Sequence, residues 1–228
     1  MPSITANPAR RPCIERIATR FASRWHQGYA RGKLKLDPVF DDAVEWARRA
    51  AASVSPASIL DAGCGLGLLA HWLREHDVGI PVHGVDSDAP KIEAARAAAV
   101  RGALSAVDFA TSDVRSAVGG GSVFLIDVLH YLSLPDRADL LSRIAANVPA
   151  RGVVYIRNGL GGKSWRHGIT RLEEWFAHVS GWLPGRRFPL PDESEIGRHF
   201  PEAQFERTIG PLWGRTPFNS FRLAFVKR

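Results

Sequence analysis

Three glycines that alternate over positions 63 to 67 limit the possible folds of this chain more than any other feature. The apolar run before them predicts the end of a buried strand, and the apolar spacing from Ala70 onward predicts a helix. Glycine lets the backbone approach a ligand closely, because no Cβ atom stands in the way. A strand, a tight glycine turn and a helix therefore predict a ligand-binding turn in an α/β protein.

The spacing of these glycines differs from the familiar dinucleotide-binding pattern. That pattern, G-x-G-x-x-G, places its third glycine three residues after the second. Here Gly63, Gly65 and Gly67 are each two residues apart, and position 68 is Leu. Asp61 comes just before the turn. The turn therefore predicts a related ligand-binding unit that lacks the dinucleotide fingerprint.

The rest of the chain alternates between strand and helix patterns. The run 123–126 is continuously apolar, as a strand covered on both faces requires. The predicted strands cover 58–61, 81–86, 106–110, 123–127, 153–157, 204–209 and 220–227. The predicted helices cover 13–29, 38–47, 67–75, 89–101, 136–148, 171–182 and 193–200. We expect Gly28 and Gly32 to end the first helix, and Asp37 to cap the second with Pro38 at its first position.

The glycine turn, together with Asp61, resembles the first motif of class I S-adenosylmethionine-dependent methyltransferases. Three further motifs follow in the family's order, in the segments 82–88, 109–114 and 124–132. The resemblance implies an α/β fold with a seven-stranded Rossmann-like sheet, mostly parallel with the last strand antiparallel. It also implies an enzyme with S-adenosylmethionine as cofactor. On this basis we expect a flexible tail at 1–12, a helical lid at 13–55 and the catalytic core at 56–228.

The resemblance implies a cofactor site along these four motifs. Asp61 would lie beside the positively charged methionyl part of the cofactor, and Asp86 would accept hydrogen bonds from the ribose hydroxyls. Asp113 would contact the adenine amino group. Simple helix capping by Asp86 or Asp88, and an Asx turn at Asp113, remain alternative explanations. The complete predicted cofactor set is Asp61, Gly63, Cys64, Gly65, Gly67, Asp86, Ser87, Asp113, Val114 and Asp127.

The acceptor side requires a group that holds the acceptor and, for a hydroxyl, removes its proton. His130 follows the fourth core strand and has a pKa range suited to a general base, with His167 as the second candidate. Alternatively, His130 packs under the adenosine without acid–base chemistry. The predicted substrate contacts are Trp25, Tyr29, Tyr131, Arg157, Trp165 and Arg166. For Trp25 and Tyr29 the alternative is packing onto the core, and for Arg166 a solvated loop charge.

Charge raises the question of a nucleic-acid substrate. The chain of 228 residues has a formal net charge of +7, which is compatible with nucleic acid, an anionic membrane or an acidic small molecule. The Asn/Asp-Pro-Pro-aromatic signature of DNA amino-methyltransferases is absent after the fourth strand, where Asp127-Val128-Leu129-His130 stands instead. The Pro-Cys pair of cytosine-C5 enzymes occurs only at Pro12-Cys13, upstream of the core. We therefore expect a small-molecule enzyme, an O-methyltransferase acting on a hydroxyl or carboxyl oxygen of a secondary or lipid-like metabolite. An RNA-directed enzyme and a non-catalytic cofactor-binding protein are the alternatives.

The compartment and partners follow from simpler features. A disulfide between Cys13 and Cys64 would obstruct the glycine turn, which favours a reducing cytoplasm. No signal peptide and no stretch of about 18 apolar residues is present, so no transmembrane segment is expected. We expect a monomer or homodimer without a bound metal.

A second, shorter resemblance lies in the flanking segments. Residues 32–38, together with Trp165-Arg166 and 169–171, look like methyltransferases of bacterial fatty-acid-like or aryl-polyene pigment synthesis. The chain has Arg157-Asn158 where those proteins usually have Arg-Asp. That departure puts a carboxylate role after the fifth strand in doubt.

Overall fold

The protein is described by a computed structural model that covers residues 10–53, 57–117, 119–160, 188–213 and 219–228. Seven strands form one sheet in the order β3-β2-β1-β4-β5-β7-β6. The strands are β1 (Ile59–Ala62), β2 (Val82–Asp86), β3 (Val107–Thr111), β4 (Ser122–Ile126), β5 (Val153–Gly159), β6 (Phe205–Pro211) and β7 (Ser220–Lys227). The helices are α1 (Arg10–Thr19), α2 (Arg24–Leu36), α3 (Val39–Ser53), α4 (Leu68–Glu75), α5 (Ala89–Arg101), α6 (Leu134–Asn147) and α8 (Glu193–Gly197), with short 3₁₀ turns η1 (Val114–Ser116) and η2 (Leu129–Tyr131).

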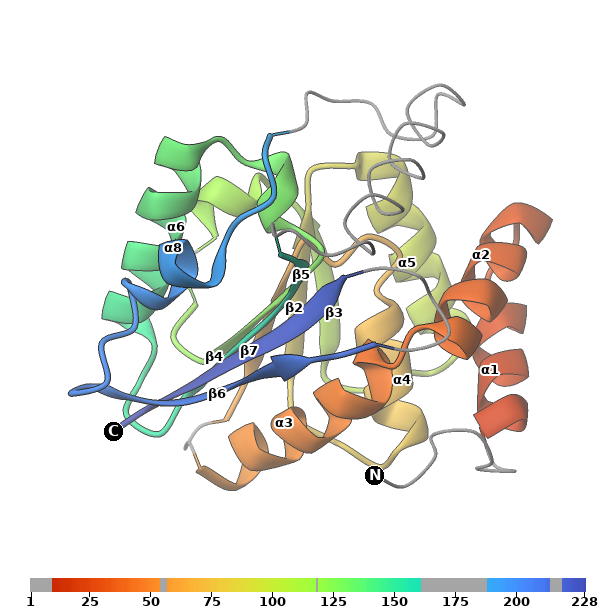
Figure 1. Cartoon of the computed structure of the whole chain (residues 1–228). Helices are drawn as coiled ribbons and strands as arrows, with labels where there is room; N and C mark the ends of the chain where they lie inside the picture. The colour runs from red at the N-terminus through yellow and green to blue at the C-terminus, as the bar shows by residue number, and fades with distance from the viewer. Residues whose placement is uncertain (1–9, 54–56, 118, 161–187, 214–218) are drawn as a thin grey trace.

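The strand directions confirm the predicted sheet. β1 pairs in parallel with β2 and β4, and the parallel ladder continues to β3 on one side and β5 on the other. β7 runs antiparallel to both β5 and β6, so it is inserted between two strands that precede it in the sequence. Figure 1 shows the sheet between α6 and α8 on one face and the N-terminal helices with α4 and α5 on the other.

Alternating side chains along each strand enter two cores. On β4 and β5, Phe124 and Tyr155 stack with ring centroids 5.1 Å apart in the core that also contains α1 to α5. Their neighbours Leu125 and Ile156 point the other way, into the core with α6 and α8. These strands are covered on both faces, which explains why their sequence is continuously apolar.

The N-terminal helices differ from the prediction. One helix was expected over 13–29, but the chain breaks between α1 and α2, where the Ser23 side chain accepts a hydrogen bond from Trp25 N and caps α2. The prediction that Gly28 and Gly32 end a helix is wrong, because both lie inside α2. The buried residues Ala30 and Leu34 anchor this helix to the core, and such packing overrides the modest helix cost of glycine.

The predicted flexible tail is also wrong for its last part. Residues 10–12 begin α1, and the Arg10 guanidinium lies 5.0 Å from the centre of the Trp72 ring while pairing with Asp41. Residues 1–9 and the predicted helix at 171–182 lie outside the described residues. Among the described residues, no helix is long and apolar enough to cross a bilayer.

Candidate active site

The glycine turn lies between β1 and α4, and all three of its glycines have a positive φ, of 82°, 53° and 69°. A Cβ atom on Gly63 would collide with Val128, and one on Gly67 would collide with the Phe109 ring. A Cβ atom on Gly65 would meet no other atom within 4 Å. Two glycines are thus required by neighbouring side chains, whereas Gly65 faces open space.

Asp86, at the end of β2, is joined to this turn. Its Oδ2 accepts a hydrogen bond from Gly65 N at 2.8 Å, and its Oδ1 accepts one from Asp88 N at 2.9 Å. Asp88 is the N-cap of α5 and accepts from Lys91 N. The capping alternative therefore holds for Asp88, and it leaves Asp86 beside the open face of the turn with its neighbour Ser87.

Asp61 lies in β1, directly before the glycine turn, and is 3% exposed. Burial, with a smaller effect of the nearby Asp86 carboxylate, raises its pKa to about 7. No ion pair to Asp61 occurs in the described part of the chain. Burial also raises the pKa of the adjacent Cys64 thiol, so that this cysteine stays protonated. The turn therefore has a buried carboxyl group, Asp61, that is only partly ionised near neutral pH and has no cation partner among the described residues.

Asp113 follows β3, where its Oδ1 accepts a hydrogen bond from Arg115 N at 2.8 Å and caps η1. It also pairs with the Arg115 side chain, which lowers the pKa of its carboxyl. This is the Asx-type turn considered above. Val114 packs against the second core, and the predicted adenine contacts of both residues stay predictions.

The carboxyl end of β4 carries a cluster of four charges, which we call the ion cluster: Lys33, Asp37, Asp127 and Arg157. Lys33 Nζ lies 2.8 Å from Asp37 Oδ2 and 3.0 Å from Asp127 Oδ2. Arg157 lies 3.0 Å from Asp37 Oδ2 and also pairs with Asp127. Burial would raise the pKa of Asp127, but Arg157 and Lys33 hold it well below its usual range. The cluster contains two cations and two anions and is electrically balanced.

The ion cluster changes how two predicted site residues are understood. Arg157 was expected to contact the substrate, yet it is 3% exposed and its guanidinium contacts Asp37 and Asp127. Asp127, predicted to contact the cofactor, has a φ of 58° and pairs with the same arginine. Their roles toward ligands stay predictions. Sequence reasoning missed Lys33 and recognised Asp37 only as a cap, which it is, since Asp37 Oδ1 accepts from Val39 N.

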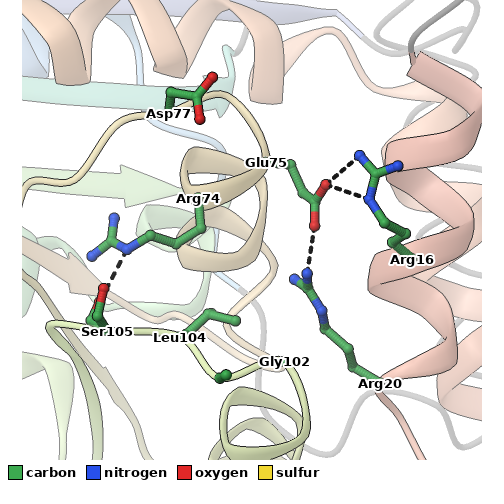
Figure 2. A pocket seen from close by; sticks show the side chains of 9 residues that line it. Arg16, Arg20, Arg74, Glu75, Asp77, Gly102, Leu104 and Ser105 are labelled. Atoms are coloured by element: carbon green, nitrogen blue, oxygen red, sulfur yellow. Dashed lines mark hydrogen bonds and ion pairs between the residues drawn. The ribbon is translucent and has the colours of Figure 1, made fainter.

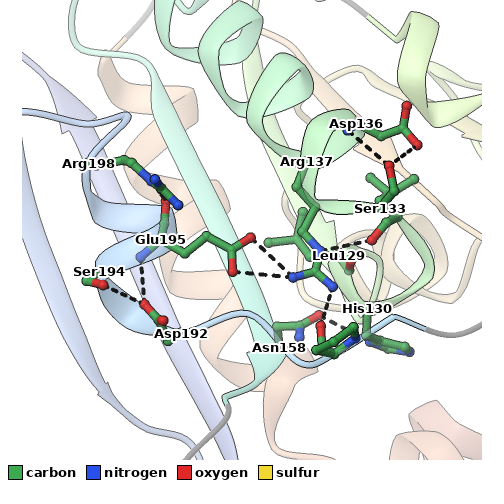
Figure 3. A network of polar contacts seen from close by, with 12 residues as sticks. Leu129, His130, Ser133, Asp136, Arg137, Asn158, Asp192, Ser194, Glu195 and Arg198 are labelled. Atoms are coloured by element: carbon green, nitrogen blue, oxygen red, sulfur yellow. Dashed lines mark hydrogen bonds and ion pairs between the residues drawn. The ribbon is translucent and has the colours of Figure 1, made fainter.

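His130 lies in η2, just after β4. Its Nδ1 is 3.3 Å from Asn158 Oδ1 on β5, and its ring centroid is 4.1 Å from that of Tyr131. Figure 3 shows the buried Arg137 behind this turn, where its Nε donates to the carbonyls of Leu129 and Leu132. Asn158 and Arg137 were not among the predicted site residues, because nothing in the local sequence shows these distant contacts.

The remaining predicted acceptor residues are placed only in part. Trp25 and Tyr29 stack on one face of α2 with centroids 5.8 Å apart, and Trp25 is 52% exposed. His167, Trp165 and Arg166 lie outside the described residues. Within the described ranges, no group of three or more His, Cys, Asp or Glu side chains could hold a metal ion.

A separate hollow of about 350 Å³ lies between α1, the end of α4 and the segment before β3. Figure 2 shows Glu75 between Arg16 and Arg20, with Arg74 directed to the Ser105 carbonyl. The end of α4 and the start of β3 belong to the amino edge of the parallel strands. This hollow is therefore remote from the glycine turn, and its arginines already have partners.

Comparisons with known proteins agree with this geometry. The family model described as "Methyltransferase domain" matches residues 38–208. No curated protein sequence matches the chain significantly.

Several solved structures share the fold. Magnesium protoporphyrin IX methyltransferase from Synechocystis PCC 6803, solved with bound SAH, is 20% identical with a TM-score of 0.64, covering 96% of this chain and 94% of its own. An O-methyltransferase family protein from Burkholderia thailandensis is 19% identical with a TM-score of 0.60, covering 92% and 62%. Geranyl diphosphate C-methyltransferase from Streptomyces coelicolor A3(2) is 16% identical with a TM-score of 0.55, covering 82% and 76%. The chain therefore belongs to the methyltransferase-domain family, the class I S-adenosylmethionine-dependent methyltransferases with a Rossmann-like sheet.

Proposed function

We propose that this protein transfers a methyl group from S-adenosylmethionine to an oxygen atom of a small-molecule acceptor. The observation that carries the proposal is the open glycine turn beside the carboxyl groups of Asp61 and Asp86, with His130 on the same edge of the sheet. Carboxyl ends of parallel strands form the ligand crevice of such sheets. The solved structures with this fold include both an O-methyltransferase family protein and a geranyl diphosphate C-methyltransferase, so the choice of oxygen rests on His130.

The residues around the turn fit S-adenosylmethionine. Gly65 leaves room for a ligand that a larger side chain would occupy. Asp61 is buried without a partner cation among the described residues, and a positively charged amino acid moiety would supply one. Asp86 stands beside Gly65 with a carboxylate that can accept hydroxyl hydrogen bonds. The other predicted cofactor residues, Gly63, Gly67, Cys64, Ser87, Asp113, Val114 and Asp127, complete the proposed site.

The protein's own contribution to the transfer is positioning and proton removal. When bound, S-adenosylmethionine would supply the methyl group of its sulfonium ion and would leave as S-adenosylhomocysteine. A hydroxyl acceptor must lose its proton, and we assign this step to the His130 imidazole. The aromatic residues Trp25, Tyr29 and Tyr131 are proposed to contact the acceptor, with His167, Trp165 and Arg166 as further candidates.

The N-terminal helices are proposed to form a lid over the acceptor. Support comes from α2, because Lys33 on this helix contacts Asp127 at the carboxyl end of β4. The helical segment therefore reaches the edge of the sheet where the glycine turn lies. Such a cover excludes water and completes the site.

The test combines cofactor binding with turnover. Gly65→Val is expected to abolish binding of S-adenosylhomocysteine in calorimetry, because the new side chain fills the open face of the turn. Gly79→Val controls for the added bulk, since Gly79 also has open space around its Cβ position but lies outside the site, and thermal unfolding of Gly65→Val controls for the strain of valine at a φ of 53°. Normal affinity in Gly65→Val would contradict the proposed cofactor site.

Turnover is measured as release of S-adenosylhomocysteine with a panel of phenols, alcohols and carboxylic acids. His130→Ala is expected to lower the single-turnover rate by about 10²- to 10⁴-fold, the usual contribution of a positioned base. An unchanged rate and pH profile would exclude His130 as the base. Transfer to carbon or nitrogen acceptors alone would contradict the choice of oxygen.

A further inference from the structure

The side-chain amide of Asn158 has only one favourable orientation. Its Nδ2 lies 2.8 Å from the Gly159 carbonyl oxygen, and its Oδ1 lies 3.3 Å from His130 Nδ1. The reversed amide would place two oxygen atoms against each other at the Gly159 carbonyl, where neither can donate. Asn158 therefore presents its carbonyl oxygen to the imidazole.

An amide oxygen can only accept a hydrogen bond, so the facing nitrogen must donate. We propose that Asn158 is a positioning residue that fixes the proton of neutral His130 on Nδ1, so that the basic lone pair is on Nε2. This inference rests on the proposed role of His130 and adds which nitrogen acts as the base. The buried position of Asn158, which is 0% exposed, keeps its carbonyl oxygen from turning toward water.

The backbone around His130 is held in place from several sides. The His130 carbonyl accepts a hydrogen bond from Phe188 N at 3.2 Å. Arg137 Nε lies 2.8 Å from the Leu129 oxygen and 3.0 Å from the Leu132 oxygen, so one fully buried guanidinium spans both ends of η2. Figure 3 shows the same guanidinium directed to Glu195 of α8. With the turn fixed by these contacts, the hydrogen bond to Asn158 can set the orientation of the ring.

Asn158 is an uncharged hydrogen-bond partner for His130, and this matters because the charged groups near His130 are already paired. Among the described residues, Asp127 is the anion that interacts with the imidazole, and Arg157 and Lys33 already balance it. Tyr131 contacts the ring from the same turn, and Arg137 on α6 is paired with Glu195. Asn158 orients the ring without adding negative charge. A carboxylate at this position would stabilise the imidazolium ion and so hold the base in its protonated form at higher pH.

The experiment reads the tautomer directly and needs no acceptor. Long-range ¹H–¹⁵N correlation spectra of the full-length protein, saturated with S-adenosylhomocysteine, report which nitrogen of each of the eight histidines carries the proton. His130→Ala assigns the signal. The expected result is a proton on Nδ1 of His130 in the wild type. A proton on Nε2 would overturn the proposal.

Two variants separate positioning from simple structural support. Asn158→Asp loses the hydrogen bond to the Gly159 carbonyl oxygen but still offers an acceptor to His130, so it should keep the Nδ1 proton and raise the His130 titration midpoint by about one pH unit. Asn158→Leu should lose the Nδ1 preference. The matched control Asn147→Asp adds the same charge on an exposed part of α6 and should leave the midpoint unchanged. An unmoved midpoint in Asn158→Asp, in a protein with unchanged thermal unfolding, would also overturn the proposal.

The two levels of the hypothesis fail in different ways. If no acceptor is methylated but His130 carries its proton on Nδ1, the proposed function fails and the orientation by Asn158 stands. If methylation depends on His130 but Asn158→Leu does not change its tautomer, His130 is the base and Asn158 does not position it.

Discussion

The carboxylates beside the glycine turn and those at the end of β4 differ in whether a cation lies beside them. Beside the glycine turn, Asp61 and Asp86 form no ion pair within the described ranges, and burial raises the pKa of Asp61 to about 7. At the end of β4, Asp127 is paired with both Arg157 and Lys33, which hold its pKa far lower. The same edge of one sheet thus contains one region whose carboxyl groups lack ion-pair partners and one region whose charges are paired.

The difference indicates which carboxylates are prepared for a ligand. Burying a charge without a partner is costly, and a protein retains such a group mainly where something else will compensate it. A balanced cluster needs no ligand and instead joins α2, the turn before α3, β4 and β5. We therefore interpret the glycine turn as a ligand site and the ion cluster as the support beside it.

The largest expected effect comes from unbalancing the ion cluster. Arg157→Met removes one of two cations and leaves the buried Asp37 and the partly exposed Asp127 to share Lys33. We expect the free energy of unfolding to fall by about 3–5 kcal/mol, the scale for breaking a buried ion pair. Urea unfolding measures it. Arg222→Met, which breaks a more exposed pair with Asp42, is the comparison, and equal losses in both would contradict the special status of the cluster.

A smaller effect is expected from Asp86→Ala, and it should fall on binding instead of stability. Loss of hydrogen bonds to a charged group should weaken S-adenosylhomocysteine binding by about 1.5–3 kcal/mol. Asp108→Ala removes an exposed carboxylate from the neighbouring β3 and should leave the affinity unchanged. Calorimetry that gives equal affinities for both variants would remove Asp86 from the site.

The third prediction concerns pH and Asp61. Its pKa is raised in the folded protein, so the folded state holds a proton that the unfolded chain loses near pH 4. Stability of the ligand-free protein should therefore decrease as pH rises from about 4 to 7. A cationic cofactor prefers the ionised carboxylate, so its affinity should increase by up to about tenfold between pH 6 and 7.

Calorimetry in buffers of different ionisation enthalpy measures the proton released on binding. Asp61→Asn should remove that part of the pH dependence, and the remainder reports the cofactor's own amino group. An identical pH dependence in the wild type and the variant would show that Asp61 does not titrate with binding.

The smallest effect is expected from Lys33→Met. The Lys33 side chain is 26% exposed, and Asp127 keeps Arg157 as its partner, so the loss of unfolding free energy should stay below about 1 kcal/mol. Lys35→Met on the same helix is exposed and serves as the reference. A loss as large as that of Arg157→Met would mean that the two cations are equally important.

The fold could be predicted largely from local patterns. Continuous apolar runs such as 123–126 indicate strands covered on both faces, and the glycine turn marks where the first helix of the core begins. The wrong predictions concern segments whose secondary structure is determined by tertiary packing. Gly28 and Gly32 are tolerated inside α2 because its other face is buried, and the sequence around them gives no sign of the partner helices.

The site was predictable where one segment supplies it and not where distant segments meet. Asp61, Gly65 and Asp86 follow from the motif at each strand end. Arg157 could be named, but not its pairing with Asp37, which is separated from it by 120 residues. The Asn158–His130 contact likewise joins two strand ends 28 residues apart. Such pairings depend on the order of strands in the sheet, which no single segment specifies.

The placement of β7 has a consequence for biosynthesis. β6 borders only β7 in the sheet, and β7 in turn borders β5. Lys227 at its end also donates to three carbonyls at the end of α6. During translation, β6 therefore emerges from the ribosome before the strand that must separate it from β5. The nascent chain has to keep this edge unpaired until residue 227 has been released from the exit tunnel, and premature pairing of β6 with β5 would trap a misfolded sheet.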